Sequence, residues 1–148
     1  MEDAKAEARI LVIEDEDNIA IALDYLLTRE GYAQTRLETG AGAVDMIREM
    51  RPDLVLLDVM LPEVSGYEIC QSVRADPDLD RIPILMMTAR GSAMERRKGL
   101  AMGATGFISK PFELKALREE VRRILADPDA ATAGARAATA EAAGQGDA

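Results

Sequence analysis

Several short apolar runs of the sequence end in residues that can carry chemistry. Glu14 and Asp15 follow the run RILVI, and Asp58 interrupts the run LVLLDVMLP. Thr88 follows IPILMM, and Lys110 follows GFIS. An ionised carboxylate buried without a partner costs roughly several kcal/mol, so Asp58 needs a positive partner inside an otherwise apolar run.

These residue types suit one kind of chemistry if they lie close together. Three clustered carboxylates repel one another unless a cation sits among them. The chain has no His, and oxygen ligands alone favour Mg²⁺ over zinc. Lys110 and Thr88 beside such an ion could bind the oxygens of a phosphoryl group, with Asp58 as the nucleophile that forms an acyl phosphate.

The elements that must position these residues alternate between short β-branched or leucine-rich runs and amphipathic runs. This alternation is typical of an α/β fold, a doubly wound parallel sheet with helices on both faces. The carboxyl ends of its strands meet at one edge, where ligands bind. We predict five strands, the second of them at a sheet edge: Arg9–Ile13, Ala33–Leu37, Asp53–Leu57, Ile82–Met87 and Gly106–Ser109.

Five helices are predicted from apolar spacing and end signals. The first carries an apolar stripe from Ile19 to Leu27 and stops before Gly31. Ser92 and Glu95 form a capping-box pattern that opens the fourth helix, which ends near Gly103. The second and third helices are expected at about Ala41–Met50 and Gly66–Ala75, and the last buries Leu114, Leu117, Val121, Ile124 and Leu125.

Length and composition predict one domain. The chain has 148 residues, of which 48% are hydrophobic and 30% are charged, enough for a real core. We assign residues 1–8 to an N-terminal arm, 9–126 to the domain and 127–148 to a disordered tail, which has ten alanines and no Val, Leu, Ile, Phe or Met. Because this tail is too short for an effector domain, we expect the domain to act alone.

Charge and cysteine content exclude several classes of function. A net charge of -9 disfavours direct binding to nucleic acid or to an anionic membrane. The N-terminal segment MEDAKAEARI has no apolar signal core, so the cytoplasm is the expected compartment. The one cysteine, Cys70, cannot form an intramolecular disulfide and is expected in the core. Without His, no Ser-His or Cys-His nucleophile pair is possible.

The motifs ILVIEDE, LVLLDVMLP, ILMMTAR and GATGFISKPF together resemble the receiver (CheY-like) domain of bacterial two-component response regulators, over Arg9–Ala126. The resemblance implies a flavodoxin-like strand order 2-1-3-4-5 and a protein that catalyses only its own phosphorylation and dephosphorylation. Asp58 would accept phosphate from a sensor histidine kinase or a phosphotransfer protein. The implied roles are Mg²⁺ ligation by Glu14, Asp15, Asp58 and the Met60 carbonyl, phosphoryl binding by Thr88 and Lys110, a switch of Thr88 and Phe107, and a cis Lys110–Pro111 peptide.

The resemblance also implies an output surface for a downstream protein, formed by the fourth helix, fifth strand and last helix. The implied assembly is a monomer or a phosphorylation-dependent dimer. Phe107 lacks the hydroxyl of the frequent Tyr, and Met60 and Arg90 are expected to slow loss of the phosphate. The output surface would include an aromatic able to swing inward among charges: Arg96, Arg97, Phe107, Glu119, Arg122 and Arg123.

Three other functions are compatible with parts of this pattern. A Mg²⁺-dependent phosphohydrolase would place a second Asp two residues after the nucleophile, where this chain has Met60. A flavin-binding module would need a Ser/Thr/Gly-rich loop after the first strand, where this chain has EDEDN, and more aromatic residues than 3%. A receiver that only binds partners would lack a site residue, yet every expected one is present.

Overall fold

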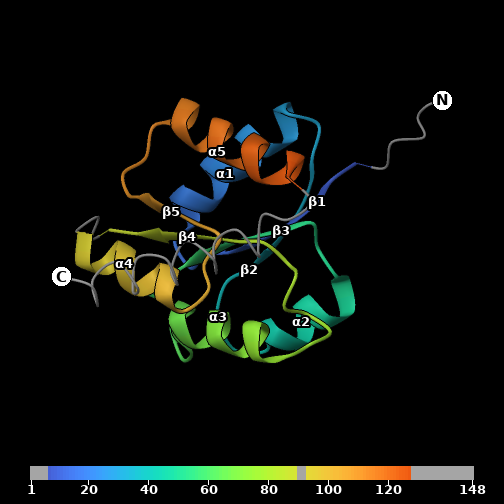
Figure 1. Ribbon diagram of the computed structural model, residues 1–148. Coiled ribbons are helices and arrows are strands. Elements are labelled where there is room, and N and C mark those ends of the chain that lie inside the picture. Colours follow the sequence, from blue (N-terminus) through green and yellow to red (C-terminus); the bar gives the residue numbers. More distant parts are fainter. Residues whose placement is uncertain (1–6, 90–92, 128–148) are drawn as a thin grey trace.

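Five parallel strands form the sheet in the computed structural model, which describes residues 7–89 and 93–127 (Figure 1). The strand order is β2-β1-β3-β4-β5, as the family resemblance implied. The elements are β1 (Arg9–Ile13), α1 (Asp17–Arg29), β2 (Ala33–Leu37), α2 (Ala43–Met50), β3 (Leu54–Asp58), α3 (Gly66–Ala75), β4 (Ile84–Thr88), α4 (Ala93–Ala101), β5 (Gly106–Ser109) and α5 (Leu114–Ala126).

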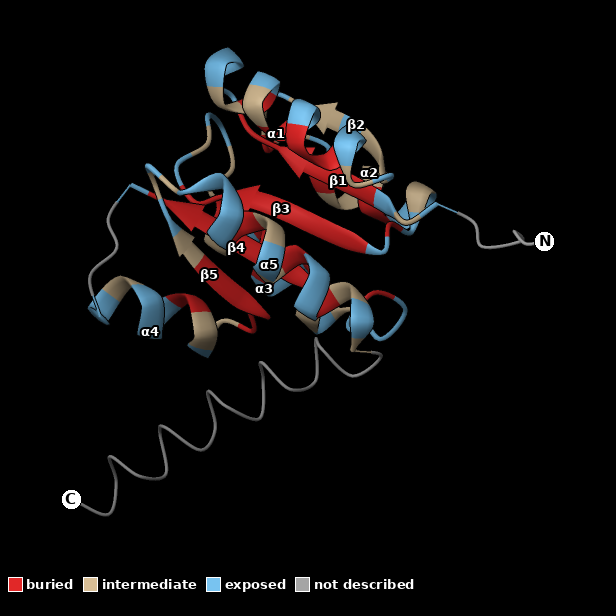
Figure 2. Cartoon of the chain, turned by 90° about the horizontal axis from the view of Figure 1, so that it is seen from above, coloured by how far each residue is buried: buried red, intermediate tan, exposed pale blue. Residues whose placement is uncertain are grey.

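The sheet is covered on both faces. Helices α1 and α5 lie on one face and α2 and α3 on the other, with α4 beside β5 (Figure 1). Strands β3 and β4 are buried along their whole length, and β1 is buried after its first residue (Figure 2). Alternate residues enter different cores, as strand geometry requires. Leu11, Val55 and Leu57 pack with α2 and α3, while Val12 and Leu56 pack with α1 and α5.

The third and fourth strands each end one residue later than the sequence pattern predicted. Asp53 precedes β3 rather than opening it, because its carboxylate accepts the backbone N–H of Arg9 at 2.7 Å. Strand β4 begins after Pro83, and Thr105 Oγ1 accepts the N–H of Ile84 at 2.9 Å. Both shifts place a chemically active residue, Asp58 or Thr88, as the last residue of a strand.

The helix predictions are confirmed in number and order for the described residues, with two corrections. Helix α2 begins two residues later than predicted, after Gly42 at φ 75°. Leu114, predicted on the buried face of α5, is 43% exposed because the first turn of the helix extends past the core. Gly31 takes the left-handed conformation expected after α1, with φ 88°. The predicted cap Ser92, together with residues 1–6, Arg90 and 128–148, lies outside the described residues.

Helix α4 contacts the rest of the domain through few groups. Gly99 is its only buried residue among those described. The hydroxyl of Tyr67 on α3 donates to Glu95 at 2.7 Å, and Lys98 Nζ lies 4.5 Å from the centre of the Tyr67 ring. A methyl group on Gly99 would lie 2.5 Å from the ring of Phe107. The missing side chain at Gly99 therefore lets the Phe107 ring lie under α4.

Helix α3 holds the start of β4 and the α4–β5 connection through Arg74. This guanidinium donates to the carbonyls of Gly103 at 2.7 Å and Ile82 at 2.8 Å, and to Thr105 Oγ1 at 3.3 Å. Cys70, one turn earlier on α3, is fully buried, as predicted, with its Sγ 3.4 Å from the Met102 carbonyl.

No helix in the described part of the chain is long and apolar enough to cross a membrane.

Candidate functional site

The carboxyl ends of four adjacent strands bring the predicted site residues to one edge of the sheet. Asp58 ends β3 and Thr88 ends β4, and both are buried. Glu14 follows β1 and is fully buried, while Asp15 beside it is exposed. Lys110 follows β5, and its N–H donates to the Thr88 carbonyl at 2.6 Å. The predicted convergence is therefore present in the fold.

Lys110 occupies the centre of the acidic residues. Its Nζ lies 2.8 Å from Glu14 Oε1, 3.2 Å from Asp58 Oδ2 and 3.7 Å from Glu16 Oε1. Burial lowers the pKa of Lys110, but the ion pairs with Glu14 and Asp58 outweigh this effect and the pKa is raised. The ammonium is thus firmly charged and held against the carboxylate of Asp58.

Glu14 is held in an unfavourable environment for a charged carboxylate. Burial raises its pKa to about 7, and the nearby charge of Asp58 acts in the same direction. The Lys110 ammonium and the Glu16 N–H, which donates to Glu14 Oε2 at 3.1 Å, only partly offset burial. An additional cation would favour ionisation of Glu14.

The acidic residues fit a hard divalent cation. One carboxylate oxygen from each of Glu14, Asp15 and Asp58 lies within 4.8 Å of the others. The chain contains no His, and Cys70, its one Cys, lies in the core, so all side-chain ligands here are oxygen atoms. Asp15 is exposed to solvent, and a few carboxylates whose coordination is completed by waters match the preference of Mg²⁺. These residues could therefore hold Mg²⁺, as the sequence predicted.

The turn after β3 orients the carboxylate of Asp58. The Met60 N–H donates to Asp58 Oδ1 at 3.1 Å, whereas Oδ2 faces Lys110. A side chain on Gly66, at the start of α3, would collide with the Asp58 carbonyl. Helix α3 therefore approaches the end of β3 closely because residue 66 is a glycine. The side chain of Met60 is 68% exposed and points no polar group at the site.

Phe107 is expected in the output surface as an aromatic able to swing inward, and in this structure it already lies inward. Its side chain is 5% exposed and packs in the core that includes Met86. The space left by Gly99 accommodates the ring in this inward position. The sequence could not distinguish an inward ring from an outward one, because a phenylalanine at this position of β5 is compatible with both.

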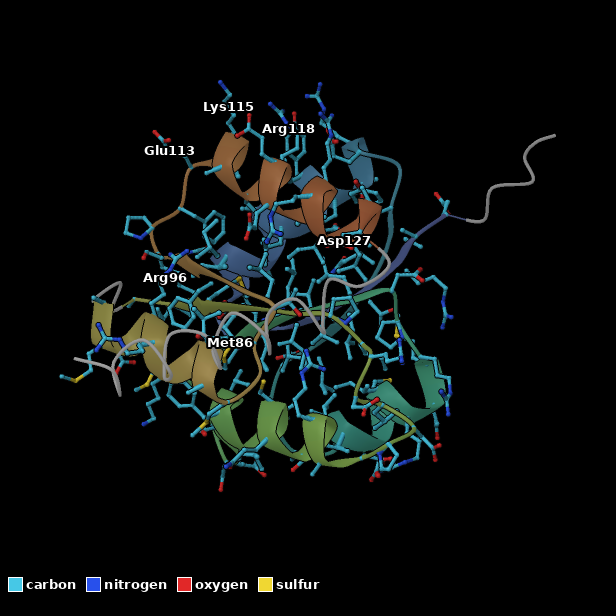
Figure 3. The ribbon with its side chains drawn as sticks, viewed as in Figure 1. Met86, Arg96, Glu113, Lys115, Arg118 and Asp127 are labelled. Atoms are coloured by element: carbon cyan, nitrogen blue, oxygen red, sulfur yellow. The ribbon has the colours of Figure 1, made fainter. Side chains whose placement is uncertain are left out.

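The remaining predicted output residues divide between two surfaces, and Glu119 is exposed on α5. Arg96 and Arg97 are exposed on α4, and Arg123 on α5 forms an ion pair with Glu120 at 2.8 Å. Arg122 instead pairs with Glu30 at the end of α1, also at 2.8 Å, so it belongs to the α1–α5 side. The outer surface of α5 is rich in charge near its amino end, where Lys115 projects away from the sheet (Figure 3).

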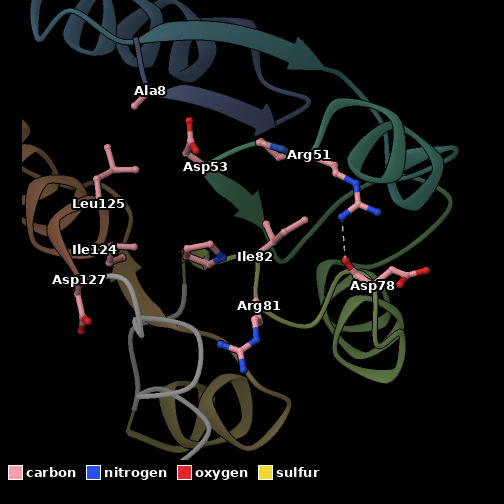
Figure 4. Close-up of a pocket in the computed structure, with 11 residues that line it drawn as sticks. Ala8, Arg51, Asp53, Asp78, Arg81, Ile82, Ile124, Leu125 and Asp127 are labelled. Carbon is pink, nitrogen blue, oxygen red and sulfur yellow. Dashed lines mark hydrogen bonds between the residues drawn. The ribbon is translucent and has the colours of Figure 1, made fainter. Parts of the chain in front are cut away.

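Two hollows mark opposite edges of the sheet. One, of about 580 Å³, borders the site between α1 and the β5–α5 loop, with an apolar lining from Ile19, Ala22, Ala89, Pro111, Phe112 and Leu114. The other, of about 570 Å³, lies at the amino ends of the strands, where Arg51 donates to the Asp78 carbonyl at 3.1 Å (Figure 4). Only the first lies beside Lys110.

The sequence pattern missed one residue beside the acidic loop, Arg36. Its guanidinium contacts the Glu14 carbonyl and the carboxylate of Asp17. In β2 it lies opposite Val12, two residues before Glu14. Only the register between the first two strands could have revealed this position. The peptide between Lys110 and Pro111 is cis, as the family resemblance implied.

Comparisons with known proteins agree with this geometry. The sequence model of the response regulator receiver domain matches residues 10–122. The PhoB phosphate regulon transcriptional regulatory protein of Rhizobium meliloti is 42% identical over 117 residues, which cover 79% of this chain and 52% of PhoB. The chain thus spans about half the length of the curated relatives it matches.

Solved structures show the same arrangement of strands and helices. A protein of Chloroflexus aurantiacus assigned as a response regulator has a TM-score of 0.79 at 35% identity, covering 82% of this chain and all of its own. The receiver domain of the sensor histidine kinase PA1611 from Pseudomonas aeruginosa, solved with magnesium coordinated in its active-site cleft, has a TM-score of 0.76 at 29% identity, with 82% and 100% coverage. The chain therefore belongs to the response regulator receiver domain family.

Proposed function

We propose that this receiver domain accepts a phosphoryl group on Asp58 from the phosphohistidine of a sensor kinase or a phosphotransfer protein. The observation that carries the proposal is the Lys110 ammonium, held 3.2 Å from Asp58 Oδ2 and 2.8 Å from Glu14 Oε1 among the carboxylates of the site. Family membership alone supports a signalling role. The contacts of Asp58 support its assignment as the phosphoacceptor.

In the proposed reaction, the carboxylate of Asp58 attacks phosphorus and the bond from phosphorus to the donor nitrogen breaks. Lys110 neutralises charge on the transferred oxygens, and the Thr88 hydroxyl at the end of the neighbouring strand donates to one of them. The Met60 N–H keeps one oxygen of Asp58 fixed while the other faces Lys110. The domain thereby catalyses its own phosphorylation, and the later attack of water returns the free carboxylate.

The residues proposed to hold Mg²⁺ are Glu14, Asp15, Asp58 and the carbonyl of Met60. When bound, Mg²⁺ supplies positive charge to the phosphoryl oxygens. The cluster of Glu14, Asp15 and Asp58 supports this ligand set through its oxygen atoms within 4.8 Å. Occupancy would also lower the pKa of Glu14, which burial raises to about 7.

The phosphodonor is proposed to dock over the hollow between α1 and the β5–α5 loop. This hollow borders Lys110 and has a mainly apolar lining that includes Ile19, Ala22 and Phe112. A helical partner could cover such a surface and bring a phosphohistidine to the site edge. The exposed side chain of Leu114, at 43%, adds apolar area at the rim.

Output is proposed to occur by protein binding at the surface of α4, β5 and α5, in the cytoplasm, with the domain as a monomer or a phosphorylation-dependent dimer. Arg96, Arg97 and Arg123 are basic residues of that surface among those the structure describes. The few contacts of α4 with the core support a movable element there. Because the matched residues cover only 52% of PhoB, a transcriptional regulatory protein, action without an effector domain is proposed separately, as is the absence of direct nucleic-acid binding.

Acetyl phosphate and intact-mass spectrometry test the phosphoacceptor. The wild-type protein should gain one phosphoryl group only when Mg²⁺ is present, and Asp58→Asn should gain none. Asp53→Asn is the matched control, because Asp53 directly precedes the same strand at its opposite end and accepts the N–H of Arg9 instead. Equal phosphorylation of Asp58→Asn and the wild type would refute the assignment.

A further inference from the structure

Arg36 lies on the edge strand β2, on the face toward α1. Leu37, its neighbour, packs into the core beside α2 and α3, so Arg36 points to the opposite face. In the β1–β2 register Arg36 lies opposite Val12 and Leu37 opposite Ile13. The next backbone contact of the ladder, from the Glu14 N–H to the Leu37 carbonyl at 3.0 Å, belongs to the metal-site loop itself.

The guanidinium of Arg36 contacts both ends of that loop. Its Nε donates to the Glu14 carbonyl at 3.0 Å, and its Nη1 pairs with Asp17 Oδ1 at 2.9 Å. Asp17 is the first residue of α1. The segment between these two contacts contains Asp15, whose carboxylate belongs to the acidic cluster. One planar side chain thus spans the loop that carries two of the three carboxylates.

The contacts of Arg36 do not explain its presence through fold stability alone. Its Nη2 is buried and has no hydrogen-bond partner among the residues that the structure describes, and a buried donor without a partner destabilises the fold. The paired carboxylate of Asp17 is 77% exposed, so the ion pair contributes little. Shorter or apolar residues would fit an edge strand at lower cost.

We propose that Arg36 is a positioning residue for the magnesium site: it fixes the backbone of Glu14 and the start of α1 so that Glu14 and Asp15 face the metal together. Both backbone groups of Glu14 are then held by β2, the N–H through Leu37 and the carbonyl through Arg36. The inference rests on the Mg²⁺ site of the proposed function. The inference assigns an influence on metal affinity to a residue that is not itself a metal ligand.

Electrostatics and positioning predict opposite effects when Arg36 is replaced. Removal of a positive charge near the acidic cluster, together with release of the Asp17 carboxylate, would strengthen cation binding. Loss of the contacts that orient the loop would weaken it, since partners of metal ligands typically contribute on the order of 10–100-fold in affinity. The sign of the change therefore separates the two roles.

Isothermal titration of the wild-type protein and its variants with Mg²⁺ tests the proposal, with circular dichroism to establish that each variant is folded. We expect Arg36→Met to weaken Mg²⁺ binding on the order of tenfold. Arg36→Lys keeps the charge but cannot reach both acceptors in the same fork geometry, so we expect a several-fold loss. Arg48→Met, which removes an ion pair with Asp76 far from the site, should bind Mg²⁺ as the wild type does.

The outcomes distinguish the inference from the proposed site. If wild-type protein binds Mg²⁺ and Arg36→Lys or a folded Arg36→Met binds it equally or more tightly, the positioning role is refuted while the metal site stands. Should Arg36→Met fail to fold, a several-fold loss in folded Arg36→Lys supports the proposal. An equal loss in Arg48→Met would attribute the effect to general destabilisation. Absence of Mg²⁺ binding by the wild type refutes the metal site, and the inference with it.

Discussion

Replacing Glu14 by Gln should change how the stability of the metal-free protein depends on pH. Burial raises the pKa of Glu14 from 4.5 to about 7 in the folded protein. The folded state therefore binds a proton more readily than the unfolded state. The stability that Glu14 contributes is fully present below its unfolded pKa and is lost as the pH rises through the folded pKa. Glutamine stays neutral and removes this dependence.

The size of the effect follows from the pKa change. One pKa unit corresponds to about 1.4 kcal/mol, so a rise from 4.5 to about 7 makes the ionised form less stable by about 3 kcal/mol. The part of this loss that develops from about pH 5.5 to about pH 8.5 is about 2 kcal/mol. This range avoids the isoelectric point of about 4.6. Relative to the variant, the wild type should lose that amount of stability.

Urea unfolding of the wild type and Glu14→Gln in parallel, in the presence of a metal chelator, measures this difference at each pH. Subtracting the two curves cancels the other titrating groups that the two proteins share. An excess of Mg²⁺ should then stabilise the wild type more than the variant at high pH. A difference that stays constant with pH would refute the reasoning. A wild type that gains stability relative to the variant at high pH would show that the Lys110 ion pair outweighs burial.

Three further predictions concern other parts of the domain. Arg74→Met should lower the free energy of unfolding by about 3 kcal/mol, because buried carbonyls lose a charged donor. Arg123→Met, which removes an exposed ion pair, should lower it by less than about 1 kcal/mol. Equal losses of stability in urea unfolding would contradict this prediction. Gly99→Ala should lower the free energy of unfolding by about 1–3 kcal/mol, because the added methyl group collides with the Phe107 ring. Alanine favours helices more than glycine does, so a gain in stability would show that the ring moves aside freely. Met60→Asn should shorten the lifetime of the phosphorylated protein, as followed by loss of mass, because a polar side chain can place the attacking water; an unchanged lifetime would contradict this role.

The sequence alone predicted the fold and the convergence of the site residues for a simple physical reason. Parallel strands have a common direction, so Asp58 and Thr88 had to arrive at the same edge once the strands were recognised. An error of one residue in a strand end, as at Asp53, did not move them to another edge. The predicted positions of Glu14 and Lys110 depended in the same way on the strands before them.

Features that depend on side-chain packing across elements could not be predicted. The inward position of Phe107 requires Gly99 to lie over its ring, and these residues belong to different elements. The role inferred for Arg36 requires the β1–β2 register, which an apolar pattern does not specify for a mixed edge strand. The exposure of Leu114 depends on how far α5 extends past the sheet, although its spacing matches the buried stripe.

Because Cys70 is buried, we expect the folded protein to react slowly with thiol reagents. Burial raises the pKa of this thiol to about 11, and the thiolate is the reactive form. A reagent such as a disulfide or maleimide can therefore reach Cys70 only when α3 separates from the α4–β5 connection. The rate of labelling therefore measures how often that opening occurs. A cysteine introduced at an exposed position such as Ser72 could be labelled with a fluorophore while Cys70 is kept.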